Sequence, residues 1–176
     1  MIEHAKIILL CVVAAVVYGI LHDQITARIC LEYFTVFHPP VFPTQSPTLL
    51  AFGWGVIATW WLGLFLGLLL TLAARAGSRP KLSAATLVQP IGCLLIVMAC
   101  SALIAGVSGF LLATYGLARE PEWMALALGP SIYPRFMADW FAHNASYASG
   151  IFGGIILCVL QYRRRGQSPI ATATPG

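Results

Sequence analysis

Two acid–histidine pairs supply the residue types that acid–base catalysis and metal binding need. Asp139 and His143 are four residues apart, so on a helix they would share one face and could form a hydrogen-bonded dyad or two metal ligands. His22 and Asp23 are adjacent and stand where an apolar run ends, so partial burial would perturb both groups. With nearby polar residues these pairs form a candidate site, called the polar cap: His22, Asp23, Arg28, Glu32, His38, Arg135, Asp139 and His143.

The chain lacks the motifs of well-known catalytic and cofactor sites. It contains no H-E-x-x-H, Walker loop, dinucleotide-binding fingerprint or nucleophile motif. The sequence therefore assigns no catalytic residue and predicts no cofactor, except that a divalent metal ion could bind Asp139 and His143. Each residue of the polar cap could also be an ordinary solvated or ion-paired group at a membrane surface.

The elements that must position these residues are long apolar segments. Of 176 residues, 59% are hydrophobic and 9% are charged, whereas an ordinary soluble domain has about 25% charged residues. Apolar runs cover residues 5–21, 47–74, 87–118 and 145–162, and about 20 apolar residues suffice to cross a bilayer. We therefore expect an all-α membrane protein with four transmembrane helices in one domain, residues 1–165, and a disordered tail, residues 166–176.

The basic residues predict how the helices are oriented, because loops rich in Lys and Arg stay in the cytoplasm. Arg28, Arg119 and Arg135 fall on one side of the predicted membrane. Seven basic residues fall on the other side: Lys6, Arg75, Arg79, Lys81, Arg163, Arg164 and Arg165. Both termini should be cytoplasmic, and the polar cap should face outward. The net charge of +4 is mainly this topology signal, and no basic–aromatic pattern predicts nucleic-acid binding.

The first apolar run could also be a signal peptide, because it is short and follows a lysine. It lacks a convincing cleavage site of small residues, so an uncleaved anchor is expected. After it, an apolar residue recurs at every fourth position at Leu21, Ile25, Ile29, Tyr33 and Phe37. This spacing predicts an amphipathic helix at the outer membrane surface, with an Arg28–Glu32 pair on a neighbouring face.

The two halves of the chain share an ordered series of similar residues. The end of the first run, Tyr18-Gly19, matches Tyr115-Gly116 at the end of the third. Further matches follow in the outer segments, with Glu32 matching Glu122 and Pro39 matching Pro130 when one residue is inserted. The pattern predicts a duplicated helical hairpin, with the two copies parallel in the membrane.

Glycines spaced by four residues lie on the second and fourth apolar runs. Gly63 and Gly67 form one such pair, and Gly150 and Gly154 form the other. Small residues let helices approach closely in lipid, so both pairs predict packing faces. These faces could serve packing within one four-helix bundle, a homo-oligomer or another membrane protein.

The motif Tyr18-Gly19-x-x-His22-Asp23-Gln24, followed by Glu32-Tyr33-Phe34-Thr35, resembles that of an uncharacterised group of small bacterial four-span inner-membrane proteins. The resemblance covers mainly the first third of the chain. It implies a bacterial inner-membrane location and no activity.

The sequence favours a non-enzymatic membrane component whose polar cap binds an ion, a small polar solute or a partner protein. A membrane-embedded hydrolase or transferase is the alternative, with Asp139 and His143 or Asp23 and His22 as acid and base. A purely structural membrane subunit is the third hypothesis, and it requires no site.

Overall fold

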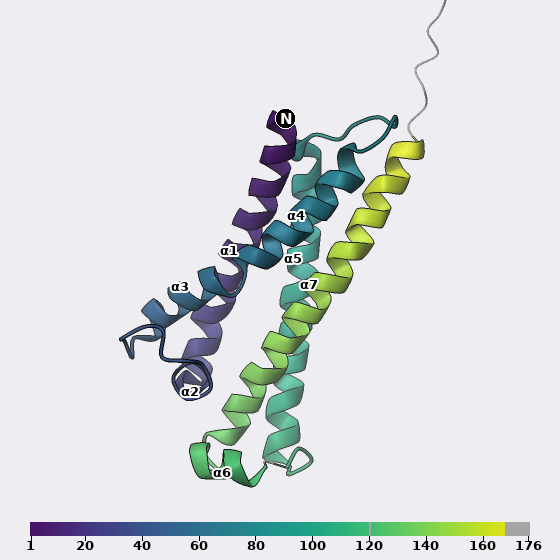
Figure 1. The fold of residues 1–176 in the computed structure, drawn as a ribbon. Coiled ribbons are helices and arrows are strands. Elements are labelled where there is room, and N and C mark those ends of the chain that lie inside the picture. The colour runs from purple at the N-terminus through teal and green to yellow at the C-terminus, as the bar shows by residue number, and fades with distance from the viewer. Residues whose placement is uncertain (120, 168–176) are drawn as a thin grey trace, which may run out of the picture.

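The structure, a computed structural model, describes residues 1–119 and 121–167, and these residues form helices and connecting segments with no strand. The helices are α1 (Ile2–Ile29), α2 (Leu31–Thr35), α3 (Pro47–Ile57), α4 (Trp60–Arg75), α5 (Ala84–Thr114), α6 (Glu122–Leu128) and α7 (Tyr133–Gln167). Figure 1 shows the N-terminus, the α4–α5 loop and the end of α7 at one end of the bundle, and α2 and α6 at the other. These are called the Arg165 end and the α6 end.

Among the described residues, four helical segments are long and apolar enough to cross a membrane, which confirms the predicted all-α class and the number of spans. They are Ile2–Ile29, Pro47–Arg75, Ala84–Thr114 and Tyr133–Gly166. The first and fourth reach well beyond the predicted runs, because hydropathy marks the stretch that matches the lipid core and not the end of the helix. The third ends before residue 118, where Gly116 adopts a φ of 69° typical of helix termination.

The predicted disordered tail, residues 166–176, lies outside the described residues except for its first two positions, which belong to α7.

The start of the second span is as the sequence predicts. The Ser46 side chain accepts a hydrogen bond from the Leu49 amide at 3.5 Å, and Pro47 occupies the first helical position.

The second span is broken at Ala58 and Thr59, between α3 and α4. The Thr59 hydroxyl donates a hydrogen bond to the Gly55 carbonyl, one turn earlier. At this level α3 crosses α1 at very short range: a Cβ atom added to Gly55 would lie 2.6 Å from the Ile20 Cα atom. A Cβ atom on Gly19 would likewise lie 2.5 Å from Thr59 Cγ2. Glycine is thus required on both helices where they cross.

The bundle consists of two helical hairpins packed side by side. Helix α1 packs on α3 and α4, α5 packs on α7, and α4 joins the hairpins by contact with α7. The predicted glycine faces lie at such contacts within the chain. Cβ atoms on Gly63 and Gly67 would lie 2.9 and 3.1 Å from Cα atoms of α1, and one on Gly154 would lie 2.9 Å from a methyl group of Leu66.

The first outer segment differs from the predicted amphipathic helix. Helix α1 continues to Ile29 and the backbone is extended at Cys30, so no single helix carries the whole stripe. Leu21 and Ile25 are 61% and 64% exposed, so this part of the stripe faces away from the bundle. Arg28 donates hydrogen bonds to Gln24 and to the Thr48 hydroxyl instead of pairing with Glu32. The exposed apolar side chains suit lipid, which explains why the stripe does not pack inward.

Candidate functional site

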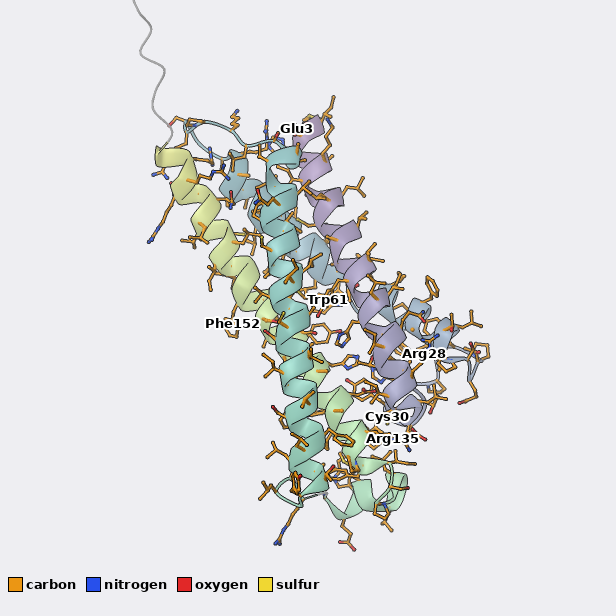
Figure 2. All side chains as sticks on the ribbon, turned by 180° about the vertical axis from the view of Figure 1, so that it is seen from behind. Glu3, Arg28, Cys30, Trp61, Arg135 and Phe152 are labelled. Atoms are coloured by element: carbon orange, nitrogen blue, oxygen red, sulfur yellow. The ribbon has the colours of Figure 1, made fainter. Side chains whose placement is uncertain are left out.

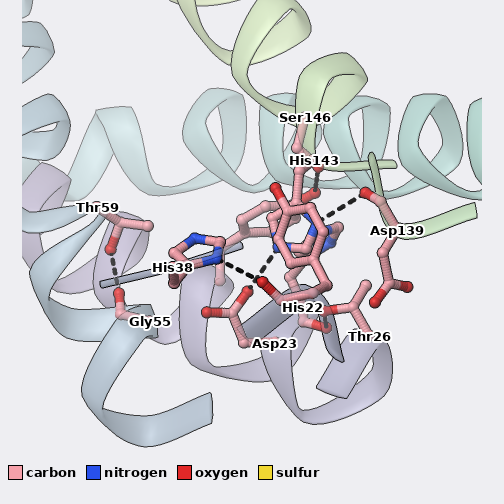
Figure 3. Close-up of polar contacts among 11 residues, drawn as sticks. His22, Asp23, Thr26, His38, Gly55, Thr59, Asp139, His143 and Ser146 are labelled. Carbon is pink, nitrogen blue, oxygen red and sulfur yellow. Dashed lines mark hydrogen bonds and ion pairs between the residues drawn. The ribbon is translucent and has the colours of Figure 1, made fainter. Parts of the chain in front are cut away.

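The site lies between α1 and α7, in the half of the bundle nearer the α6 end. Figure 3 shows that His22 and Asp23 from α1 face His143 and Ser146 from α7, with His38 beside them. Asp23 is 5% exposed and His143 is 8% exposed, so both ionisable groups lie inside the protein. Buried ionisable groups are costly unless they are paired, so their presence here points to a function.

Asp23 and His143 form the central pair. The Nε2 atom of His143 lies 3.3 Å from Oδ1 of Asp23, and its Nδ1 atom lies 2.8 Å from the backbone carbonyl oxygen of Asp139. A carbonyl oxygen only accepts hydrogen bonds, so Nδ1 must carry the hydrogen. One further proton is then shared between Nε2 and the Asp23 carboxylate, which makes the pair electrically neutral overall.

His22 completes a three-residue cluster. Its ring meets the His143 ring edge-on, with 4.6 Å between ring centroids, and stacks on Tyr18 at 5.8 Å. The buried Nε2 atom of His22 has no hydrogen-bond partner among the described residues. Ligand atoms of His22, Asp23 and His143 all lie within 4.8 Å of one another, close enough to hold a metal ion after small side-chain rotations.

His38 lies next to this cluster in the segment after α2. Its Nδ1 atom lies 2.7 Å from the Tyr33 carbonyl oxygen and therefore donates to it, and its ring packs on Trp54 at 4.7 Å. Burial lowers the pKa of His38, and only part of this effect is offset by the hydrogen bond to Tyr33. The ring is therefore neutral at pH 7 and keeps Nε2 as an acceptor.

A small cavity of about 90 Å³ adjoins all four of these side chains, which gives room for several water molecules or a hydrated ion. Near its wall the Tyr18 and Ser146 hydroxyl groups are hydrogen-bonded at 2.8 Å. The residues lining the cavity are Ala15, Tyr18, Gly19, His22, Asp23, Tyr33, Phe34, His38, Trp54, Ala58, Thr59, Leu62, Met98, His143, Ser146 and Tyr147.

Asp139 and His143 are not joined through their side chains as the sequence predicted. His143 uses the Asp139 backbone carbonyl, while the Asp139 carboxyl group points away from the ring (Figure 3). Asp139 is fully buried, yet neither carboxyl oxygen has a hydrogen-bond partner in residues 1–119 and 121–167. The ligand atoms that converge in this geometry are those of His22, Asp23 and His143, and the Asp139–His143 metal pair stays a prediction.

The remaining polar-cap residues do not reach the cluster. Arg28 and Arg135 are exposed at the α6 end, far from Glu3 at the opposite end of the bundle (Figure 2). Glu32 accepts a hydrogen bond from the Cys30 thiol at 3.5 Å, and burial raises the pKa of this thiol to about 12, so it stays protonated. Of the eight predicted residues, the structure brings together His22, Asp23, His38 and His143.

Sequence reasoning missed several residues of the cavity wall. Tyr18 lies one helical turn before His22, and Ser146 lies one turn after His143, so their spacing could have indicated both. Thr59 and Trp54 carried no such signal, because the broken second span that positions them was not predicted.

A scan against protein-family models and searches of curated proteins and of solved structures found no match to this chain.

Proposed function

We propose that this integral membrane protein binds a divalent transition-metal ion between α1 and α7, with His22, Asp23 and His143 as ligands. The observation that carries the proposal is the convergence of three ligand atoms within 4.8 Å of one another beside a cavity. Two imidazoles and a carboxylate form a ligand set that suits Zn²⁺ and similar ions, leaving one position for water or another ligand.

The surroundings of His143 support this assignment. Histidines that bind metals usually donate the hydrogen of the other ring nitrogen to a carboxylate or a backbone carbonyl, which fixes the orientation of the ring. His143 does so through Nδ1 and presents Nε2 to Asp23. Zinc bonds of about 2.0 to 2.2 Å place neighbouring ligand atoms about 3.4 Å apart. Asp23 and His143 already meet this spacing at 3.3 Å, so His22 is the ligand that must move inward.

The same proposal places the site in the outer half of a bacterial inner membrane, with both termini in the cytoplasm. The excess of basic residues at the Arg165 end supports this orientation. A cysteine introduced at exposed Gln45, at the opposite end, should react with an impermeant maleimide added to intact spheroplasts. If this cysteine reacts only after the membrane is opened, it faces the cytoplasm and the proposed orientation is wrong.

The Asp23–His143 pair also supports the alternative of a membrane-embedded hydrolase or transferase. Its 3.3 Å separation is close to the range of 2.6 to 3.2 Å expected of acid–base partners. Both hydrogen-bonding positions of His143 are occupied by acceptors, so the ring is not aimed at Ser146 as a serine nucleophile would require. Metal binding therefore explains the geometry better.

The test is metal analysis of the purified protein in detergent. After loading with Zn²⁺ and removal of excess, roughly one ion per chain is expected, and His143→Gln and Asp23→Asn should each lower the affinity by about tenfold or more. His4→Gln changes an exposed histidine at the other end of the chain and should have no effect. Co²⁺ should give the visible absorption of a tetrahedral site. If the wild-type protein retains no metal after loading, or if the two variants bind metal as tightly as the wild type does, the proposal is contradicted.

A further inference from the structure

A large apolar groove runs along the outside of the bundle, between α1 on one side and α5 and α7 on the other. Its volume is about 470 Å³, within the range of about 300 to 1,000 Å³ typical of small-molecule sites. Its floor consists of small residues, including Ala102, Gly106 and Ala142, and its rims are exposed apolar side chains such as Ile25 and Leu103. The exposed stripe of α1 thus forms one rim of this groove.

The groove faces the hydrocarbon region of the membrane, because its walls belong to three membrane-spanning helices. Its occupant must therefore be a lipid or a segment of protein. A helix of 10 to 12 Å diameter fills on the order of 800 Å³ for each 10 Å of its length. The groove, at about 470 Å³, can take up only one face of a helix, whereas it can enclose most of a hydrocarbon chain.

Polar atoms at the groove wall indicate that the occupant is more than a hydrocarbon. Asp139 lines the groove, and its two carboxyl oxygens have no partners among the described residues. The side chain is 0% exposed, so it must turn toward the groove to reach an occupant. His22 also lines the groove, but its ring belongs to the proposed metal cluster, so Asp139 is the polar group available to an occupant of the groove. Leaving such a buried group unsatisfied is costly, so a ligand that hydrogen-bonds to it would be held at this point.

A hydroxyl group fits these requirements best. It both donates and accepts, so it can satisfy the Asp139 carboxyl group in either protonation state. A charged head group would have to leave water for this buried apolar wall, and an alkane would leave the carboxyl group unsatisfied. We propose that the groove binds a long-chain lipid alcohol of the surrounding membrane, with its hydroxyl group at Asp139 and its chain along α1 and α5.

This site goes beyond the proposed metal-binding function, although Tyr18 and His22 line both the groove and the metal cavity. The shared wall would bring the head of the lipid alcohol next to the metal cluster. The inference does not depend on the metal, since its argument uses only the groove and Asp139.

The test is photolabelling of the purified protein with a long-chain alcohol that carries a diazirine next to its hydroxyl group. Labelled peptides should come from the groove walls of α1, α5 and α7, and unlabelled alcohol should compete about tenfold better than its methyl ether or the alkane of equal length. Ala99→Phe should block the groove and abolish labelling. Cys100→Phe, at the adjacent exposed position outside the groove, is the matched control.

In the Asp139→Leu variant, unlabelled alcohol should compete with the photolabel no better than the alkane does, because the carboxyl group that binds its hydroxyl group is lost. Equal labelling of the Ala99→Phe and Cys100→Phe variants, or equal competition by alcohol and alkane, would overturn the inference. So would a stable oligomer that Ala99→Phe dissociates, since a protein would then occupy the groove. Ala99→Phe should still bind metal and His143→Gln should still bind the alcohol, so the two proposals can fail separately.

Discussion

His143 has a hydrogen-bond acceptor at each ring nitrogen, the Asp139 carbonyl at Nδ1 and the Asp23 carboxylate at Nε2. Without a metal, both bonds can form only if the pair of side chains retains one extra proton. A metal ion bound by Nε2 and the carboxylate takes the place of that proton. Metal binding and proton binding at this site therefore exclude each other.

Metal binding to the wild-type protein should consequently release a proton, and the affinity should fall as the pH is lowered. Isothermal titration calorimetry in two buffers of different ionisation enthalpy measures the number released. Asp23→Asn removes the carboxylate that holds the proton, so its residual binding should release fewer protons. An observed enthalpy that does not depend on the buffer would contradict the shared proton.

At the residue scale, the sequence identified His22, Asp23, His38 and His143 as polar groups of interest but not their pairing. The i, i+4 spacing of Asp139 and His143 correctly predicted their common face. The backbone carbonyl then proved to be the nearer acceptor on that face. Asp23 lies 120 positions from His143 in the sequence, and only the packing of α1 on the second hairpin brings the two together. No local pattern contains that information.

Among the helices, the crossing of α1 and α3 lies beside the proposed metal site. Gly19 and Gly55 allow the two backbones to meet, and the nearby break at Ala58 and Thr59 directs α4 toward α7. The cavity wall includes Gly19 and Thr59. A change in this crossing would therefore alter both the stability of the hairpin and the position of His22 relative to His143.

Gly19→Ala should destabilise the protein by about 1 to 3 kcal/mol, the usual cost of overpacking. The added methyl group would lie 2.5 Å from Thr59 Cγ2 and 2.7 Å from the Gly55 carbonyl oxygen, so backbone must move. Unfolding in a graded series of denaturing and mild detergents, followed by circular dichroism, measures the loss. Gly92→Ala is the control, because no atom lies within 4 Å of its added Cβ. If the two variants are equally stable, the crossing of α1 and α3 can accommodate an added methyl group at no cost.

The sequence predicted elements better than it predicted their ends. Hydropathy located the four spans because burial in lipid needs apolar side chains at every position of a helix face. It did not locate the break in the second span, where Thr59 satisfies a backbone carbonyl in an otherwise apolar run. Nor did it show that α1 and α7 extend through His22 and His143, which places these residues inside the bundle.

At the scale of the whole molecule, the buried Arg165 side chain joins elements at the Arg165 end, together with Arg79, which donates a hydrogen bond to the Tyr162 carbonyl. Arg165 is 1% exposed, and its guanidinium donates to the carbonyl groups of Ala73, Ala76, Arg79 and Pro80 at 2.7 to 3.0 Å. These carbonyls belong to the end of α4 and the following loop, so Arg165 joins the last helix to the first hairpin. The sequence had indicated only a topology signal from the three consecutive arginines.

The predicted duplication of a helical hairpin also concerns the whole molecule, and it stays a prediction. The packing of α1 on α3 and α4, and of α5 on α7, gives each half one hairpin. The second span is broken and the fourth is continuous, so two copies would have diverged most in the returning helix. Both proposed sites lie between the hairpins, where residues of the two halves face each other.

Arg165→Gln should therefore destabilise the bundle by about 3 kcal/mol, because it leaves several carbonyl groups without their charged donor. Arg164→Gln removes the same charge from an exposed neighbour and is the matched control for effects on membrane orientation. Thermal unfolding of both variants in the same detergent measures the difference, and limited proteolysis of the α4–α5 loop reports its release. If the two variants unfold alike and their loops are cleaved at equal rates, the guanidinium contacts do not join the hairpins. If only Arg165→Gln loses stability while its metal content is unchanged, the two ends of the bundle are energetically independent.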